Sequence, residues 1–250
     1  MERGNEWTAR VAAAVGKRIL YFREQAKDER GRRMTVQALA SKCADLGLPL
    51  GRPAISKLEN GLRQTITVDE VLVLARALGV APLLLLFPIG AEESIEVLPG
   101  EVMRPFRAAL WFTGEQPWPD DSDAEAKAWW EGSFPAIAFR DHVRLADGYR
   151  HALRMAQLFR QTAYEGSAAD RDKNLQAAYT HEREVASIER QLRGIRKAMR
   201  DRNLEPPVTR GLEHIDCADG GEARPLHDGY VLGLLPSEMR QLADRDADDG

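Results

Sequence analysis

The sequence predicts an all-α protein with five short helices in its first third and two long helices further on. Apolar residues recur at spacings of three and four along most of the chain, which is the period of one helix face. Glycine and proline interrupt this spacing often before residue 90 and rarely between residues 137 and 203. We therefore expect a five-helix domain over residues 1–90, a linker rich in tryptophan, proline and acidic residues over 91–136, a helical region over 137–203 and a largely irregular tail over 204–250.

The composition is that of a soluble globular protein. Hydrophobic residues make up 44% of the chain and charged residues 30%, unlike disordered or membrane-spanning chains. The longest apolar run, residues 80–88, contains Pro82 and is far shorter than the roughly 20 residues that cross a bilayer. No apolar stretch near the N-terminus resembles a secretory signal. Cys43 and Cys217 lie far apart without a cysteine or histidine cluster, so we expect a cytoplasmic protein without a disulfide, metal or membrane contact.

The charge is divided unevenly along the chain. The net charge is −4, which for the whole protein argues against binding to a polyanion. Residues 1–88, however, hold 14 lysines and arginines against 9 aspartates and glutamates, a balance of +5. The rest of the chain holds 21 against 30, a balance of −9. A basic N-terminal unit joined to an acidic remainder is expected where only one part meets phosphates.

The first helix is predicted from an apolar stripe of Val11, Val15, Ile19, Leu20 and Phe22. Its exposed face is expected to carry Lys17, Arg18 and Arg23, and the polar residues 28–33 end it. Thr35 is expected to cap a second helix by accepting a hydrogen bond from a backbone N–H. The inward stripe of this second helix is Leu39, Ala40, Cys43 and Leu46, and Gly47 stops it.

The third helix is predicted to begin near Arg52 or Pro53 and to end at Glu59, before Asn60 and Gly61. Ile55 and Leu58 are expected to point into the core. The opposite face then carries Ala54, Ser56 and Lys57, with Arg52 at the N-terminal tip. A short helix with small and polar outward residues can enter the major groove of DNA, where side chains reach base edges.

Two further helices complete the N-terminal part. The fourth covers Val68–Leu78 and stops at Gly79, with Val71, Leu74, Ala75 and Leu78 inward. The fifth covers the apolar residues 81–87. Five helices with a basic tip on the third indicate a domain that reads DNA.

Two segments, residues 55–63 and 68–80, resemble the XRE family, the Cro and phage-repressor type of helix-turn-helix protein. The first has the family's I-S-x-x-E-x-G pattern, and the second has its L-A-x-x-L-x-V pattern. The resemblance covers residues 11–88, and the residues in its two motifs are similar to those of many actinobacterial members. The resemblance implies a sequence-specific regulator of transcription, expected to be a repressor, that binds double-stranded DNA as a homodimer.

Two features depart from the family pattern. Members often place glutamine directly after the cap of the second helix, whereas here Val36 follows Thr35 and Gln37 comes next. The stretch 40–55 is also longer than in compact phage repressors, which implies an extended second helix or a wider turn before the third.

The resemblance implies a set of DNA-contacting side chains: Gln37, Arg52, Ala54, Ser56, Lys57 and Arg63. Arg52 is expected at a guanine or a phosphate. Arg63 is expected at a phosphate, because loops beside a recognition helix run along the DNA backbone. Glu59 is instead expected to have a structural role, tying the end of the third helix to a neighbouring helix or arginine.

The middle of the chain allows two interpretations. Four of the five tryptophans lie between residues 92 and 135, among prolines and the acidic run 120–123. These aromatic residues either pack onto neighbouring helices from a linker or form a docking patch for a partner. Residues 94–98 resemble a short strand, but no second strand is evident.

Long helices are predicted over residues 139–164 and 173–202. In the second, a heptad seam consists of Val185, Ile188, Leu192, Ile195 and Met199, flanked by Glu184, Arg190, Arg193 and Arg196. This seam can pair within the chain as a hairpin or between chains as a coiled coil. In the tail, residues 230–235 form an apolar patch, and 244–250 are expected to be disordered.

The sequence contains no catalytic or cofactor-binding motif. His181 and Glu182 begin a zinc-protease pattern, but Val185 occupies the position of its second histidine. Glycine-rich phosphate loops and nucleophile elbows are absent. We therefore expect no enzyme and no cofactor. The alternative to a DNA-binding regulator is a protein-interaction or antitoxin-like module, and the C-terminal region is expected to sense an unknown protein or small-molecule effector.

Overall fold

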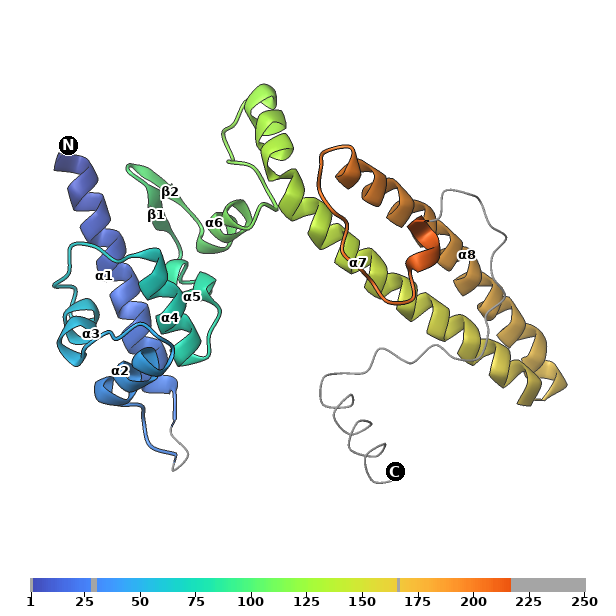
Figure 1. Cartoon of the computed structure of the whole chain (residues 1–250), viewed down its shortest axis with the longest axis horizontal. Coiled ribbons are helices and arrows are strands. Elements are labelled where there is room, and N and C mark those ends of the chain that lie inside the picture. Colours follow the sequence, from blue (N-terminus) through green and yellow to red (C-terminus); the bar gives the residue numbers. More distant parts are fainter. Residues whose placement is uncertain (1, 28–30, 166, 217–250) are drawn as a thin grey trace. The chain divides into compact units, whose positions relative to one another are not determined.

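Helices make up most of the computed structural model of the protein, which describes residues 2–27, 31–165 and 167–216 (Figure 1). The described chain divides into two units after Ala126. The first unit contains α1 (Glu2–Gln25), α2 (Val36–Asp45), α3 (Arg52–Glu59), α4 (Val68–Leu78) and α5 (Pro82–Leu86). It continues through β1 (Ile95–Leu98), β2 (Glu101–Met103) and α6 (Pro105–Phe112). The prediction of a mostly helical protein is therefore confirmed, with one small two-stranded sheet in addition.

The helices α1 to α5 surround one apolar core. The core contains the predicted inward residues Val15, Ile19, Leu39, Ala40, Cys43, Ile55, Leu58, Val71, Leu74, Ala75 and Leu78. The first helix α1 contacts α3, α4 and α5, and α2 contacts α3 and α4. Among the core predictions Leu46 was wrong, because its side chain is 44% exposed. Helix α2 has already ended at Asp45, and Gly47 with a φ of +92° turns the chain away.

The segment predicted as a linker is largely folded. Strand β1 pairs antiparallel with β2, and Ile95 lies opposite Met103. The predicted strand therefore has a partner. This partner, β2, has only three residues, too few to show the alternation of polar and apolar residues that predicts a strand. Phe87, Ala108 and Ala109 form a small core with apolar residues of the strands. The domain boundary predicted at residue 90 consequently differs from the division after Ala126, because the hairpin and α6 belong to the first unit.

A bidentate ion pair joins the β1–β2 hairpin to α1. Arg10 donates from Nε to Oε2 of Glu96 at 2.8 Å and from Nη2 to Oε1 at 3.0 Å. The Gly100 N–H also donates to Oε1 of Glu96 at 2.9 Å. The Gly100 N–H and then the Arg10 guanidinium hold the pKa of Glu96 below its ordinary value of 4.5.

Acid is expected to release this contact. Because the pKa of Glu96 is lowered by folding, its stabilising effect is complete above its ordinary pKa and is lost as the pH falls through the lowered pKa. An NMR acid titration of the Gly100 amide measures the midpoint. In the Arg10→Ala protein the midpoint should lie at higher pH than in the wild type; an equal midpoint in both proteins would contradict the role given to Arg10.

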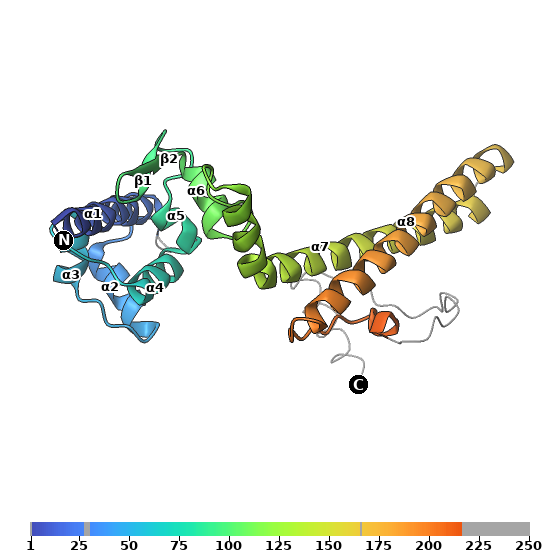
Figure 2. The ribbon, with the colours of Figure 1, turned by 90° about the horizontal axis from the view of Figure 1, so that it is seen from above.

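The long helices α7 (Asp123–Glu165) and α8 (Ala168–Arg200) lie side by side in both views (Figures 1 and 2). Helix α7 begins well before the predicted residue 139, so Trp129, Trp130 and Pro135 are helical. Ala146, Tyr149 and Ala152 of α7 form a core with Ile188 and Leu192 of α8. The predicted seam therefore pairs within the chain, as a hairpin.

Part of the predicted irregular tail packs onto this hairpin. Leu212 and Ile215, at the 3-10 helix η1 (Glu213–Asp216), are buried in the α7–α8 core. Arg196, predicted to flank the seam, is buried and donates to the Pro207 carbonyl at 2.9 Å; the same nitrogen lies 2.7 Å from Nε2 of His142. Cys217, the predicted apolar patch at 230–235 and the predicted disorder at 244–250 lie outside the described residues.

The acidic charge is not carried by the helical pair. Residues 127–216 hold 16 basic and 13 acidic residues, a balance of +3. The acidic excess lies in residues 89–126, with 2 basic against 9 acidic, and in residues 217–250, with 3 against 8. The acidic excess after residue 88 is therefore carried by two segments of the sequence, one before and one after the mildly basic residues 127–216. Among the described helices, none has the length and apolar content to span a membrane.

Candidate nucleic-acid interface

Helix α3 is short because both of its ends are fixed by local chemistry. Gly51 precedes the helix in an extended conformation, and its carbonyl accepts from the N–H groups of Ala54 at 2.9 Å and Ile55 at 3.2 Å. Pro53 lies in the first turn, where its missing N–H is not needed. Arg52 and Pro53 are exposed there. The start of α3 is thus a rigid tip that carries an arginine.

The other end of α3 is closed by a turn at Gly61. The Leu62 N–H donates to the Lys57 carbonyl at 2.8 Å, and the Gly61 N–H donates to the Leu58 carbonyl at 2.9 Å. This pattern of two bonds requires the positive φ of Gly61, +67°. The helix therefore stops after eight residues, as the Asn60 and Gly61 signal predicts.

The backbone of α3 rests directly on α1. A Cβ added to Gly16 of α1 would lie 1.9 Å from the Leu58 carbonyl oxygen and 2.7 Å from its carbon. Real side chains do not approach so closely, so only glycine permits this contact. Ile55 and Leu58, at 0% and 1% exposure, fill the space beside it. The inward face of α3 is therefore held against α1 by backbone as well as by side chains.

An ion pair fixes the same end of α3. Arg23 donates from Nε to Oε1 of Glu59 at 2.6 Å and from Nη2 to Oε2 at 2.9 Å, and from Nη1 to the Met34 carbonyl at 3.0 Å. The side chains of Arg23 and Glu59 are only 12% and 6% exposed. The hydrogen bond to Glu59 raises the pKa of Arg23 against the opposing effect of burial. The structural role predicted for Glu59 is confirmed, and the predicted exposure of Arg23 was wrong.

The predicted contact residues of α3 lie on its outward side. Arg52 and Lys57 are exposed, and Ala54 and Ser56 are half-buried. Gln37 is exposed in the first turn of α2, which Thr35 caps by accepting from the Ala38 N–H at 3.0 Å. Helix α3 therefore exposes two cations, and two small half-buried side chains lie between them in the sequence.

Arg63 is engaged within the protein. Its Nη1 donates to Oε1 of Glu70 at 2.6 Å, and its side chain is 23% exposed. Oε2 of Glu70 accepts from the Thr67 N–H at 3.0 Å at the start of α4. The guanidinium thus ties the loop after α3 to α4, and the phosphate contact expected of Arg63 stays a prediction.

The segment that contains α2 and α3 is basic beyond the predicted residues. Residues 31–63 contain six basic side chains, namely Arg32, Arg33, Lys42, Arg52, Lys57 and Arg63, against the acidic Asp45 and Glu59. Glu59 is neutralised by Arg23. Lys42 is exposed in the last turn of α2 and was missed as a contact candidate. The local charge balance of this segment is the signal that could have identified Lys42.

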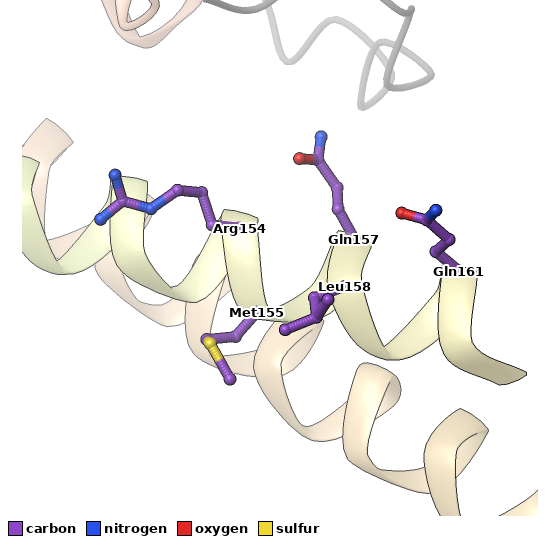
Figure 3. A pocket seen from close by; sticks show the side chains of 5 residues that line it. All are labelled: Arg154, Met155, Gln157, Leu158 and Gln161. Carbon is purple, nitrogen blue, oxygen red and sulfur yellow. The ribbon is translucent and has the colours of Figure 1, made fainter. Parts of the chain in front are cut away.

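The other candidate sites have fewer side chains that could bind a ligand or react. The described parts of the chain contain no group of histidine, cysteine and carboxylate side chains placed to hold a metal ion. Cys43 is buried in the first core, and burial raises the pKa of its thiol, which disfavours the reactive thiolate. A shallow groove on α7 is lined by Arg154, Met155, Gln157, Leu158 and Gln161 (Figure 3). All five belong to one helix, and Figure 3 shows Arg154, Gln157 and Gln161 pointing away from Met155 and Leu158.

No family model matches the chain, and comparisons with curated proteins and with solved structures find no match. What α2 and α3 bind must therefore follow from their own side chains.

Proposed function

We propose that the protein is a helix-turn-helix regulator of transcription that reads double-stranded DNA with α3. The observation that carries this proposal is a short helix whose inner face is locked by Gly16, Ile55 and Leu58 while Arg52 and Lys57 are exposed on its outer side. A major groove about 12 Å wide accepts one α-helix, and rigid presentation limits the entropy lost on binding. The resemblance of α3 and α4 to the XRE family supports the same function, with repression as the expected outcome.

Each outward residue has a physical role in this proposal. Arg52 and Lys57 meet guanine edges or phosphates, because their cationic groups match those acceptors. Ala54 and Ser56 are small, so the α3 backbone can approach the bases. Gln37 is exposed at the start of α2, and we expect it to lie beside the DNA backbone, where an amide contacts phosphate or sugar.

Truncating the two α3 cations is expected to weaken DNA binding. Arg52→Ala and Lys57→Ala should each cost about 1–3 kcal/mol of binding free energy where the side chain contacts a base. A contact to phosphate should instead lower the salt dependence of binding by about one counterion for each residue. Gel shifts of the full chain over a salt series measure both effects. Arg154→Ala, on α7, is the matched control, and unchanged binding in both α3 variants would contradict the assignment.

A second function is favoured by exposed apolar side chains in the loop after α3 and on α4. Leu62, Val68 and Leu72 are large, apolar and more than half exposed, as in a surface that docks another protein. In this alternative the same module is a protein-interaction or antitoxin-like domain. Full-length protein that retains no double-stranded DNA at low salt would favour the docking function over DNA recognition.

A further inference from the structure

Helix α4 has an outer face that its own core does not use. Its inner face is fully engaged, because Val71, Leu74, Ala75 and Leu78 are buried. On the opposite side Val68 is 77% exposed and Leu72 is 51% exposed. Leu62, which directly follows the turn at the end of α3, is 68% exposed, and the Arg63–Glu70 ion pair ties its loop to α4. Val68 and Leu72 thus leave exposed apolar side chains on the outer face of α4.

Two opposite charges flank Leu72 on this face. Asp69 lies three residues before Leu72 and Arg76 four residues after it, and both are exposed. Residues at these spacings share one face of a helix. With a rise of about 1.5 Å per residue, Asp69 lies about 4.5 Å before Leu72 along the axis and Arg76 about 6 Å after it. The outer face of α4 therefore has a negative end and a positive end at nearly equal distances from an apolar centre.

We propose that α4 packs against α4 of a second copy of this chain, antiparallel and with the twofold axis at Leu72. Antiparallel pairing places Arg76 of each copy beside Asp69 of the other, within about 1.5 Å along the axis. Two reciprocal ion pairs then flank a contact between the two Leu72 side chains, with Val68 extending the apolar surface. Such an interface is isologous, since the same patch serves both copies.

The charge pattern selects both the partner and the orientation. Parallel pairing would bring Arg76 beside Arg76 and Asp69 beside Asp69, and like charges repel. A second copy carries the same two charges, and a twofold axis at Leu72 places each charge beside its opposite. An unrelated partner would need opposite charges at the same two spacings. The consequence for DNA rests on the proposed function: two α3 helices related by a twofold axis read two half-sites of opposite orientation.

Crosslinking at Leu72 tests the pairing in the full-length protein and without DNA. Leu72→Cys is made together with Cys217→Ser, while Cys43 stays in place because it is completely buried. A short bismaleimide is then expected to give a covalent dimer on a denaturing gel. Adding Arg76→Glu should reduce the dimer yield several-fold, because two like-charged contacts replace the ion pairs, and adding Asp69→Arg should do the same.

Mixing these two charge variants should restore the dimer. The new glutamate of one chain faces the new arginine of the other, and the native Asp69 of the first faces the native Arg76 of the second. Both contacts of the mixed pair are then attractive. Thermal unfolding of each protein shows whether it is folded, and Asp69→Asn, which removes charge without reversal, should give an intermediate yield.

Three results would overturn the pairing: a yield no higher than that of the Cys217→Ser chain, a yield insensitive to both charge substitutions, or a mixture that forms no more dimer than its components. DNA retention is scored separately with the wild type and Arg52→Ala. A chain that binds DNA but does not crosslink therefore contradicts the pairing alone. A chain that crosslinks but retains no DNA supports the pairing and contradicts the proposed function.

Discussion

Replacing Gly16 with alanine is expected to displace α3 and abolish DNA binding. The added methyl group would lie 1.9 Å from the Leu58 carbonyl oxygen. This oxygen belongs to the backbone and cannot rotate away as a flexible side chain would. The loss of stability should reach about 3 kcal/mol, at the upper end of the usual cost of overpacking. Thermal unfolding and gel shifts of the same preparation measure the two effects.

Gly194→Ala is the matched control for this substitution. Gly194 lies within α8, and a Cβ added there meets nothing within 4 Å. Alanine at an open helical position should stabilise the protein by about 0.5–1 kcal/mol, because glycine loses more backbone entropy on folding. Equal effects of the two substitutions would show that α3 does not rest on α1 in the way described.

Removing Arg23 is expected to lower the stability at least as much as adding a methyl group at Gly16. Arg23→Met would leave the Glu59 carboxylate, at 6% exposure, without its bidentate donor, and the Met34 carbonyl would also lose a hydrogen bond. Removing one partner of a buried ion pair leaves the other charge unpaired and costs about 3 kcal/mol or more of stability. Urea unfolding measures this loss, and hydrogen exchange of the α3 amides shows whether it is local.

A double substitution separates charge from packing at this position. Arg23→Met with Glu59→Leu removes both charges and keeps apolar volume, so much of the lost stability should return. Arg144→Ala removes an exposed partner of Asp141 and should cost less than about 1 kcal/mol. A double variant as unstable as Arg23→Met would contradict the view that the uncovered Glu59 charge causes the loss.

The elements that could be predicted from the sequence have local signals. Thr35, Asn60, Gly61 and Gly79 mark helix ends through caps and backbone conformation, which depend on a few neighbouring residues. The inward positions of α3 and α4 follow from apolar spacing alone. For this reason the bounds of α3 and α4 and the burial of Ile55 and Leu58 agree with expectation.

Features set by distant parts of the chain could not be predicted in this way. Arg23 looks like a surface residue until the fold brings Glu59 to it across 36 positions. Strand β2 is stabilised by pairing with β1 and by contacts near Phe87 rather than by its own pattern. The heptad seam of α8 has the same appearance whether its partner is α7 or another chain. Each outcome depended on contacts between segments far apart in the sequence.

In the candidate site, too, local features could be predicted from the sequence and features set by distant contacts could not. Placing Arg52, Ser56 and Lys57 outward required only the period of one short helix. The engagement of Arg63 with Glu70 depends on how the loop after α3 folds against α4, and an isolated motif does not contain that information. Gly16 and Arg23 position α3 through contacts between α1 and α3 that the local sequence does not indicate.

Sequencing the genomic DNA that the purified full-length protein retains tests the central claim most directly. We expect fragments that share a short sequence motif, and we expect their enrichment to be lost in the Arg52→Ala/Lys57→Ala protein while the Arg154→Ala protein keeps it. Retained DNA without a shared motif, or equal enrichment by the α3 double variant and the wild type, would contradict recognition of DNA sequence by α3.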